Sequence, residues 1–150
     1  MPKNSADEIS VKNADKADFE KIFPLLEQLW PDRKLDFGMM ERIFNNELAN
    51  DKALMLCAWK GTEILGYAAG NVNENFYHMG KYIHIHVLIV DVKKRGTRIG
   101  THLLDVITEY AKLNGCHAVE LDSNFHRQSA HYFYEHYGFH KRAFTFTIEM

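Results

Sequence analysis

A basic, glycine-containing segment in the middle of the chain has the residue types of an anion-binding turn. Residues 93–101 read Lys-Lys-Arg-Gly-Thr-Arg-Ile-Gly-Thr, after an apolar run that predicts a strand and before an amphipathic pattern that predicts a helix. The start of a helix carries unpaired backbone N–H groups and about half a positive charge. Glycine lets a phosphate approach the backbone closely. We therefore expect this segment to bind a pyrophosphate or a similar polyanion.

Two common nucleotide-binding motifs do not fit the segment. After Gly96 the next glycine is Gly100, which is followed by Thr101 and His102, so the Gly-Lys-Ser/Thr end of a Walker loop is missing. The dinucleotide-binding fingerprint needs three glycines in the order Gly-x-Gly-x-x-Gly, and this segment does not have that spacing. Neither a nucleotidase nor a dehydrogenase is favoured.

The segment resembles the acetyl-CoA-binding motif of the GCN5-related N-acetyltransferase (GNAT) superfamily, Arg/Gln-x-x-Gly-x-Gly/Ala between a strand and a helix. Arg95, Ile99 and Gly100 fit the motif, whereas Arg98 stands where the family most often has its middle glycine. Residues 130–139 read Ala-His-Tyr-Phe-Tyr-Glu-His-Tyr-Gly-Phe and resemble the family's later motif, Ala-x-x-x-Tyr-Glu-x-x-Gly-Phe. The two motifs occur in the family's order, so the resemblance covers the second half of the chain and, more loosely, all of it.

The resemblance implies a fold, a donor substrate and a set of binding residues. The fold is the mixed α/β acyl-CoA N-acyltransferase fold, a mostly antiparallel central sheet flanked by helices, with its fourth and fifth strands splayed around the cofactor by a bulge. Residues 1–150 are expected to form one such domain, which takes acetyl-CoA as acetyl donor and needs no metal. The implied cofactor-binding residues are Leu88, Ile89 and Val90 through their main chain, together with Arg95, Gly96, Thr97, Arg98, Ile99, Gly100, Thr101 and Arg127.

Acetylation of an amine needs a neutral nucleophile, and a histidine in the strand before the basic segment is the candidate base. An alkylamine with a pKa near 10.4 is only about one part in a thousand neutral at pH 7. His84 and His86 are expected to share one strand face with Leu88 and Val90. His86 falls where relatives often have glutamate, and histidine titrates near pH 6.5. Two alternatives are a half-buried histidine bonded within the sheet and a metal-ligand pair, although no third ligand is evident.

Tyr134 matches the family tyrosine that donates a proton to the departing CoA sulfur, which implies a role as general acid. The alternative is an aromatic side chain that packs on a core-facing helix. Arg127 stands where many family members have an asparagine that contacts the cofactor, and it is expected to bind a CoA phosphate or the acceptor substrate.

The periodicity of apolar residues predicts the elements that position these groups. Strands are expected over residues 8–13, 54–59, 64–72, 82–91 and 119–122, with one or two more over 139–148. Helices are expected between Asp15 and Pro31, and over 36–48, 99–114 and 127–137. Residues 73–81 are expected to form a long connection that covers the substrate.

Composition narrows the class of protein. With 150 residues, 46% apolar, 25% charged and a formal net charge of −2, the chain is typical of a soluble globular domain and gives no support to nucleic-acid binding. Cys57 and Cys116 have no CxxC spacing and are expected to be buried free thiols in a reducing compartment. The chain has no recognisable signal peptide or membrane span, so a cytoplasmic location without membrane contact is expected.

The first two predicted helices are the expected binding region for the acceptor substrate. We expect a primary amine of a small molecule, bound by the first two helices and their connection. An acidic, aromatic-edged cleft is one interpretation of Trp30, Asp32, Asp36 and Glu41, and an ordinary solvated helix connection is the favoured alternative. The alternatives are a protein or peptide N-acetyltransferase and a noncatalytic acyl-CoA-binding sensor. A last strand over Thr145 to Met150 is a candidate for pairing in a homodimer.

Overall fold

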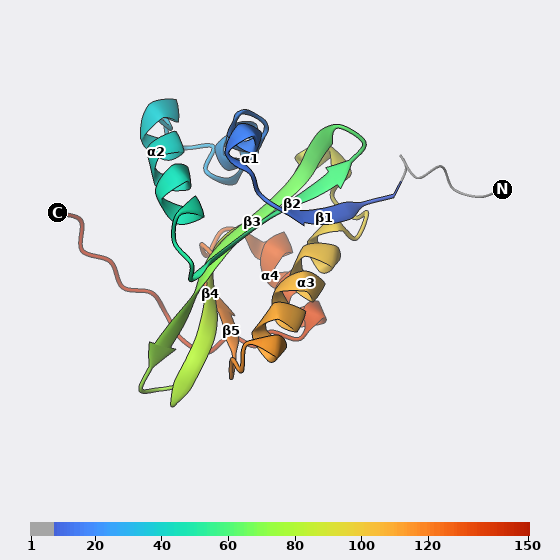
Figure 1. Ribbon diagram of the computed structural model, residues 1–150. Helices are drawn as coiled ribbons and strands as arrows, with labels where there is room; N and C mark the ends of the chain where they lie inside the picture. Colours follow the sequence, from blue (N-terminus) through green and yellow to red (C-terminus); the bar gives the residue numbers. More distant parts are fainter. Residues whose placement is uncertain (1–7) are drawn as a thin grey trace. The chain divides into compact units, whose positions relative to one another are not determined.

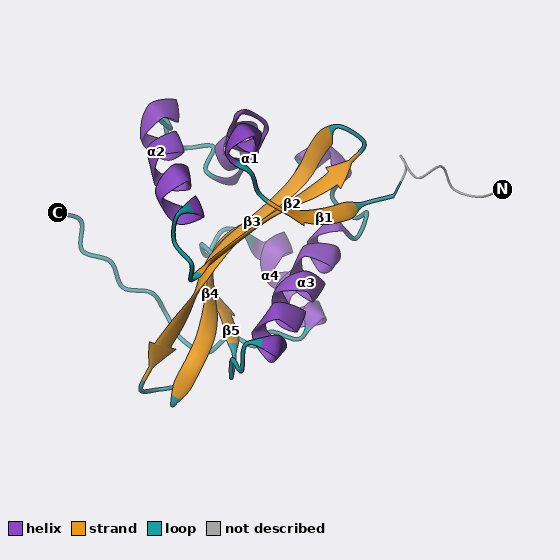
Figure 2. Ribbon diagram, in the orientation of Figure 1, coloured by secondary structure: helices purple, strands orange, loops and turns teal. Residues whose placement is uncertain are grey.

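The computed structural model of the protein describes residues 8–150. Over this range, a five-stranded sheet and four α-helices alternate along the chain (Figure 1, Figure 2). The strands are β1 (Ser10–Asn13), β2 (Ala53–Lys60), β3 (Glu63–Asn75), β4 (Gly80–Val90) and β5 (Val119–Leu121). The helices are α1 (Phe19–Leu29), α2 (Phe37–Leu48), α3 (Ile99–Leu113) and α4 (Gln128–Tyr137), with short 3₁₀ turns η2 (Lys16–Asp18) and η3 (Val92–Lys94).

The chain divides into two compact units. The first ends at Glu120 and the second runs from Leu121 to Met150. The first unit contains the sheet up to the beginning of β5, together with α1, α2 and α3, and the second contains α4. The expectation of one domain over residues 1–150 stays a prediction.

The strands of the sheet follow one another in chain order, β1-β2-β3-β4-β5. The first four form antiparallel pairs. At the entrance to β5, the N–H of His117 donates to the carbonyl of Lys81 at 2.7 Å, and the N–H of Ile83 donates to the carbonyl of Ala118 at 3.0 Å. Because β5 has 3 residues and β4 has 11, β5 accompanies only part of β4.

The hairpin between β3 and β4 is longer, and its loop shorter, than the sequence predicts. Cross-strand pairing continues to Asn75 and Gly80, so the loop is residues 76–79 rather than 73–81. Apolar and polar residues alternate only weakly in this polar stretch, so the sequence does not reveal the strand ends. Backbone hydrogen bonds between β3 and β4 extend the two strands there. The prediction of a long covering connection is therefore wrong.

Aspartate side chains cap the starts of the first two helical segments, and the sequence predicts the first of these caps, at Asp15. The carboxylate of Asp15 accepts from the N–H of Ala17 at 3.4 Å, and that of Asp36 accepts from the N–H of Met39 at 2.8 Å. Each bond satisfies a backbone donor that the first turn leaves unpaired. Asp36 is thus accounted for as a helix cap.

Helices cover both faces of the antiparallel strands. Figure 1 shows α1 and α2 on one side of the sheet and α3 on the other. On the α1 and α2 side, the core joins buried residues of both helices to alternate residues of the strands: Phe19, Ile22, Leu25, Leu26, Phe44, Met55, Cys57, Tyr67 and Ile89. Burial raises the pKa of the Cys57 thiol to about 12, with a smaller contribution from Asp18, so this cysteine is an inert packing residue.

A bulge in β4 changes the face on which its histidines lie. Ala69 pairs with Val87 and Gly70 with Ile85, so His86 is an extra residue in the ladder. Val87 packs against the α1 and α2 core, and His86 bonds Asn71 of β3, two residues beyond Ala69 on the same face. Leu88 pairs instead with Ala68. The expectation that His84 and His86 share a face with Leu88 and Val90 is therefore wrong, because the bulge reverses the alternation.

The start of α3 packs tightly on the sheet. A Cβ atom added at Gly66 of β3 would lie 2.9 Å from Ile99 Cγ2 and 3.1 Å from Leu103 Cδ1. Ile99 and Leu103 are themselves fully buried. Close contact at Gly66 therefore fixes where α3 begins.

In the second unit, the strands predicted over 139–148 do not form. α4 ends at Gly138, whose φ of 129° suits glycine, and residues 139–150 carry no helix or strand. Phe144, Phe146 and Ile148 alternate as predicted but are 71%, 92% and 86% exposed. Alternation indicates a strand only where a neighbouring strand pairs with the backbone, and no strand pairs with this segment in the structure. A homodimer through Thr145 to Met150 stays a prediction.

Candidate active site

The turn between β4 and α3 adopts the backbone geometry that the glycine of the motif serves. Arg98 has φ 67° and ψ 13°, in the left-handed region, and it is the N-cap of α3. Gly96 has φ 83°. A left-handed residue is the ordinary place for glycine, and a side chain there costs about 1 kcal/mol. Arg98 thus has the backbone conformation that glycine favours, although it carries a long side chain.

The first turn of α3 is the predicted anion site. The side chain of Arg98 does not cap the helix, so the N–H groups of Ile99, Gly100 and Thr101 meet no side-chain acceptor from their N-cap. The side chains of Arg95 and Arg98 are exposed around this point. An uncapped helix start surrounded by guanidinium groups has the donors and the charge that a pyrophosphate needs.

The turn is tied to neighbouring elements. The side chain of Arg95 donates through Nε to the carbonyl of Val90 at 3.5 Å, and the N–H of Val92 donates to Gln28 of α1 at 2.9 Å. The hydroxyl of Thr97 donates to the carbonyl of Lys94. These bonds hold the turn between a strand end and a helix, and they do not occupy the N–H groups of α3.

The last residues of β4 expose little side chain. Leu88 and Ile89 are buried and Val90 is half-buried. Their side chains belong to the core, as the sequence predicts, so a ligand would meet these residues through their main chain.

His86 lies exposed at the bulge and belongs to a chain of polar contacts. Its Nε2 atom is 2.5 Å from Oδ1 of Asn71 in β3, and Nδ2 of Asn71 donates to Oε2 of Glu47 in α2 at 3.1 Å. The rings of His84 and His86 have centroids 5.0 Å apart. The sequence reading missed Asn71 and Glu47. The only signal was a polar residue within each predicted element, and the register that joins them depends on the bulge.

Arg127 and Tyr134 meet within the second unit. Tyr134 is a buried residue of α4. Burial raises the pKa of its hydroxyl, while the charge of Arg127 and a hydrogen bond from the Arg127 side chain act in the opposite direction. The structure thus gives Arg127 a partner that the sequence reading did not foresee, although the seven-residue spacing on one helix is a usable signal.

The acceptor cleft stays a prediction. Trp30 ends α1 and packs against the core, and Asp36 caps α2. At the β3–β4 hairpin, Phe76 and Tyr77 are exposed. Neither set of residues is shown to bind a substrate.

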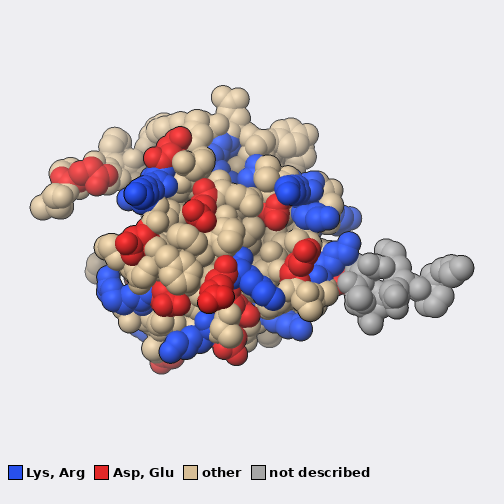
Figure 3. Space-filling view, turned by 90° about the horizontal axis from the view of Figure 1, so that it is seen from above, with Lys and Arg blue, Asp and Glu red and all other residues tan. Residues whose placement is uncertain are grey.

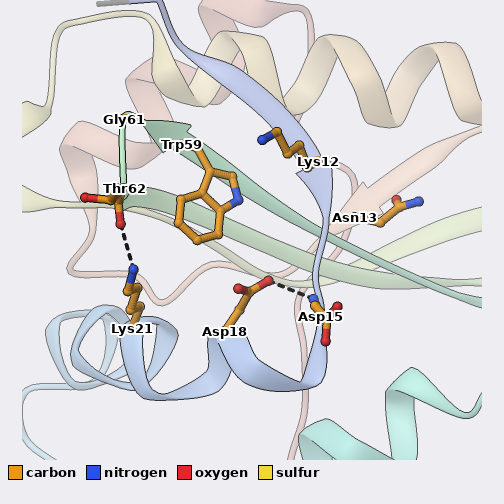
Figure 4. Close-up of a pocket in the computed structure, with 8 residues that line it drawn as sticks. All are labelled: Lys12, Asn13, Asp15, Asp18, Lys21, Trp59, Gly61 and Thr62. Carbon is orange, nitrogen blue, oxygen red and sulfur yellow. Dashed lines mark hydrogen bonds between the residues drawn. The ribbon is translucent and has the colours of Figure 1, made fainter. Parts of the chain in front are cut away.

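A separate hollow of about 400 Å³ lies between β1, the turn from β2 to β3 and the segment that leads into α1 (Figure 4). It is lined by Lys12, Asn13, Asp15, Asp18, Lys21, Trp59, Gly61 and Thr62. Its polar groups are bonded to one another: Lys21 Nζ donates to the carbonyl of Thr62 at 2.7 Å, and Asp18 accepts from the N–H of Asp15 at 2.8 Å. None of the predicted site residues lines this hollow.

Surface charge and metal-ligand geometry add two observations. On the face in Figure 3, Lys and Arg side chains are interspersed with Asp and Glu side chains. Within residues 8–150, no group of three or more His, Cys, Asp or Glu residues is arranged to hold a metal ion. No helix in that range is long and apolar enough to cross a membrane. The cytoplasmic location and the absence of nucleic-acid binding stay predictions.

The fold agrees with comparisons to known proteins. Residues 19–139 match the model of the acetyltransferase (GNAT) family. An aminoalkylphosphonate N-acetyltransferase of Salmonella typhimurium is 26% identical over 137 residues, covering 91% of this chain and 88% of that protein. The chain belongs to the GNAT family and is an acetyl-CoA-dependent N-acetyltransferase.

Solved structures confirm the predicted fold. The structure described as a transcriptional regulator from Bacillus halodurans has a TM-score of 0.87 at 23% identity, covering 95% of this chain and 100% of that one. An aminoglycoside N-acetyltransferase in complex with CoA also has a TM-score of 0.87, at 14% identity, covering 100% of this chain and 98% of that one. Several structures with different described roles thus share this architecture.

Proposed function

We propose that the protein transfers the acetyl group of acetyl-CoA to a primary amine of a small molecule by direct attack, with His86 as the base and Tyr134 as the acid. The observation that carries this mechanism is the exposed His86 at the β4 bulge, on the strand that leads into the anion-binding turn. The proposal that residues 1–150 act as one domain is supported by the family match, which extends over residues 19–139.

Acetyl-CoA would be held by main-chain and charged groups. The N–H groups of Ile99, Gly100 and Thr101 face the uncapped start of α3, where negative charge is stabilised. Gly96, Thr97, Arg95 and Arg98 form the turn, and the main chain of Leu88, Ile89 and Val90 is proposed to pair with the pantetheine arm. When bound, acetyl-CoA supplies the thioester that the amine attacks. We assign Arg127 to a CoA phosphate or to the orientation of Tyr134.

The proposed base has to remove a proton from a protonated or attacking amine. His86 is exposed, and a neutral imidazole ring nitrogen accepts a proton, which makes histidine a common general base. General-base catalysis by a positioned side chain typically contributes 10²- to about 10⁴-fold. The ring of His84 lies beside the proposed base, with its centroid 5.0 Å from that of His86.

The proposed acid has to stay protonated until CoA leaves. Burial raises the pKa of Tyr134, which keeps its proton on the hydroxyl through the neutral range. A thiolate with a pKa near 8.5 is a fair leaving group without help. We therefore assign Tyr134 a rate-enhancing rather than an indispensable role.

Substrate chemistry is proposed from the named relative. Because the Salmonella protein is described as acting on aminoalkylphosphonates, a small amine that carries an anionic phosphonate is the first acceptor to test. The two other functions considered from the sequence, a peptide acetyltransferase and a noncatalytic acyl-CoA sensor, give different outcomes in the same assay.

The test is CoA release measured with aminoalkylphosphonates, aminoglycosides and a lysine peptide as acceptors, for the wild type and for His86→Gln. Saturable release with a free amine, intersecting initial-velocity patterns and a loss of about 100-fold in His86→Gln are expected. Parallel lines would indicate an acetyl-enzyme and contradict direct attack. Activity on the peptide alone would favour a protein acetyltransferase, and acetyl-CoA binding without release would favour a sensor.

A further inference from the structure

The polar contacts of His86 pass through two residues on other elements. Glu47 lies in the last turn of α2, Asn71 lies in β3, and His86 lies at the bulge of β4. The bonds are 3.1 Å between Glu47 and Asn71 and 2.5 Å between Asn71 and His86. Residues far apart in the sequence therefore form one continuous chain of hydrogen bonds.

The donor and acceptor chemistry of this chain has one consistent direction. The ionised carboxylate of Glu47 is only an acceptor, so it must face the amide nitrogen of Asn71. The amide oxygen of Asn71 then faces His86, and an amide oxygen also only accepts. The proton of the neutral His86 ring must therefore be on Nε2. Nδ1 is left as the basic nitrogen.

We infer that Asn71 and Glu47 are positioning residues that fix the tautomer and orientation of His86, with the ring proton on Nε2. This inference rests on the proposed role of His86 as the base. A carboxylate orients a histidine through a direct bond in many hydrolases, and here an asparagine amide stands between the two groups. The group in contact with Nε2 of His86 is therefore a neutral amide.

Burial differs along the chain of hydrogen bonds from Glu47 to His86. Glu47 is half-buried. Burial raises the pKa of Tyr67, and the charges of Cys57 and Glu47 add smaller contributions, so the Glu47 carboxylate interacts electrostatically with a core residue. Asn71 is also half-buried, whereas His86 is exposed. The chain of bonds thus runs from a shielded acceptor to an accessible base. It also links the base to α2, one of the helices expected to bind the acceptor.

The matched substitutions separate orientation from charge. Asn71→Leu removes the relay, and Glu47→Leu leaves the Asn71 amide free to turn its NH₂ group toward His86. Glu47→Gln keeps an acceptor oxygen for Asn71 without the charge. Asn73→Leu is the control, because Asn73 lies two residues along β3 and donates only to the carbonyl of Asn71 at 3.4 Å.

The first readout is the tautomer of His86, measured by long-range ¹H–¹⁵N correlation spectra at about pH 8.5, where histidine is mostly neutral. The chain has 9 histidines, so the His86 signal is assigned by its loss in His86→Gln. We expect a proton on Nε2 in the wild type, Glu47→Gln and Asn73→Leu, and a shift toward Nδ1–H in Asn71→Leu and Glu47→Leu. A wild-type proton on Nδ1, or unchanged shifts in both leucine variants, would overturn the inference.

The second readout is the division between kcat and KM. Asn71→Leu and Glu47→Leu are expected to lower kcat by about tenfold or more with an unchanged KM for acetyl-CoA, and Glu47→Gln is expected to restore most of the loss. Thermal unfolding of each variant is compared with that of the control Asn73→Leu to show whether the fold is kept. If a leucine variant does not fold, the kinetics of Glu47→Gln provide the test. If His86→Gln keeps wild-type turnover, the base assignment itself fails, and the tautomer spectra still tell whether the relay exists.

Discussion

Arg127 donates a hydrogen bond to the Tyr134 hydroxyl two helical turns away, and its charge opposes the effect of burial on the pKa of that tyrosine. Burial is the larger influence, so the pKa of Tyr134 stays raised. Arg127 therefore orients a hydroxyl that keeps its proton. These properties suit the proposed role of Tyr134 as an oriented general acid. Tyr134 lies within the sequence motif at residues 130–139, and Arg127 lies just before it.

Tyr134→Phe tests the acid directly. The substitution keeps the ring and removes the proton donor, so we expect turnover to fall by about tenfold and the affinity for acetyl-CoA to stay the same. Steady-state kinetics and calorimetric titration with acetyl-CoA measure the two quantities. Tyr132→Phe is the matched control, because Tyr132 lies on the same helix and is 67% exposed. Wild-type turnover in Tyr134→Phe would remove the role.

Arg98→Gly tests the left-handed turn. Glycine relieves the cost of a side chain at φ 67°, so we expect the free energy of unfolding to rise by about 1 kcal/mol. Loss of the guanidinium is expected to weaken acetyl-CoA binding several-fold at low salt. Arg98→Ala separates the effects, since it loses the charge and keeps the strain. Equal stability of the two variants in urea unfolding would contradict the backbone argument.

Gly70→Ala tests the packing beside the bulge. An added Cβ would lie 2.5 Å from the carbonyl oxygen of His84, which is backbone and has little room to move. We expect a destabilisation of about 2 kcal/mol or more together with a loss of turnover, because the ladder beside His86 must shift.

Gly61→Ala is the comparison for Gly70→Ala. Gly61 has φ 60° with nothing within 4 Å of its added Cβ, so only backbone strain of about 1 kcal/mol is expected there. Urea unfolding of both variants gives the comparison. A smaller effect at Gly70 than at Gly61 would contradict the close contact.

Alkaline pH is expected to destabilise the fold through Cys57. Its pKa is raised from 9.0 to about 12, so the folded state binds this proton more tightly than the unfolded state does. The resulting stability is complete below pH 9 and is lost as pH rises from 9 toward 12, by at most about 1.4 kcal/mol per pH unit. Cys57→Ala should show a shallower fall in the free energy of unfolding over pH 8–10. Parallel curves would contradict the assignment.

Local signals account for what the sequence predicted well. The cap at Asp15, the end of α4 at Gly138 and the turn around Arg95 all depend on neighbouring residues. Such features follow from short-range hydrogen bonding and backbone preference, so the four helices and the turn before α3 were predicted close to their observed places.

Features that depend on strand register were not predicted. One extra residue at His86 reverses the face of every residue on one side of it, and no local pattern reveals where the insertion lies. The same register brings Asn71 beside His86 and within reach of Glu47, so the relay was invisible as well. The prediction of strands after Gly138 was wrong for a related reason, because alternation of apolar residues does not show whether another strand is present to pair with them.

The order of strands in the sheet has a consequence for how the chain folds. Every strand of the series β1-β2-β3-β4-β5 lies beside the one before it in the chain, and β2, β3 and β4 are joined by short hairpin loops. Small loops close at little entropic cost, and contacts of low sequence separation favour rapid folding. The hairpin that contains the bulge at His86 consists entirely of residues that precede α3 in the chain, so its two strands can pair before α3 has been synthesised.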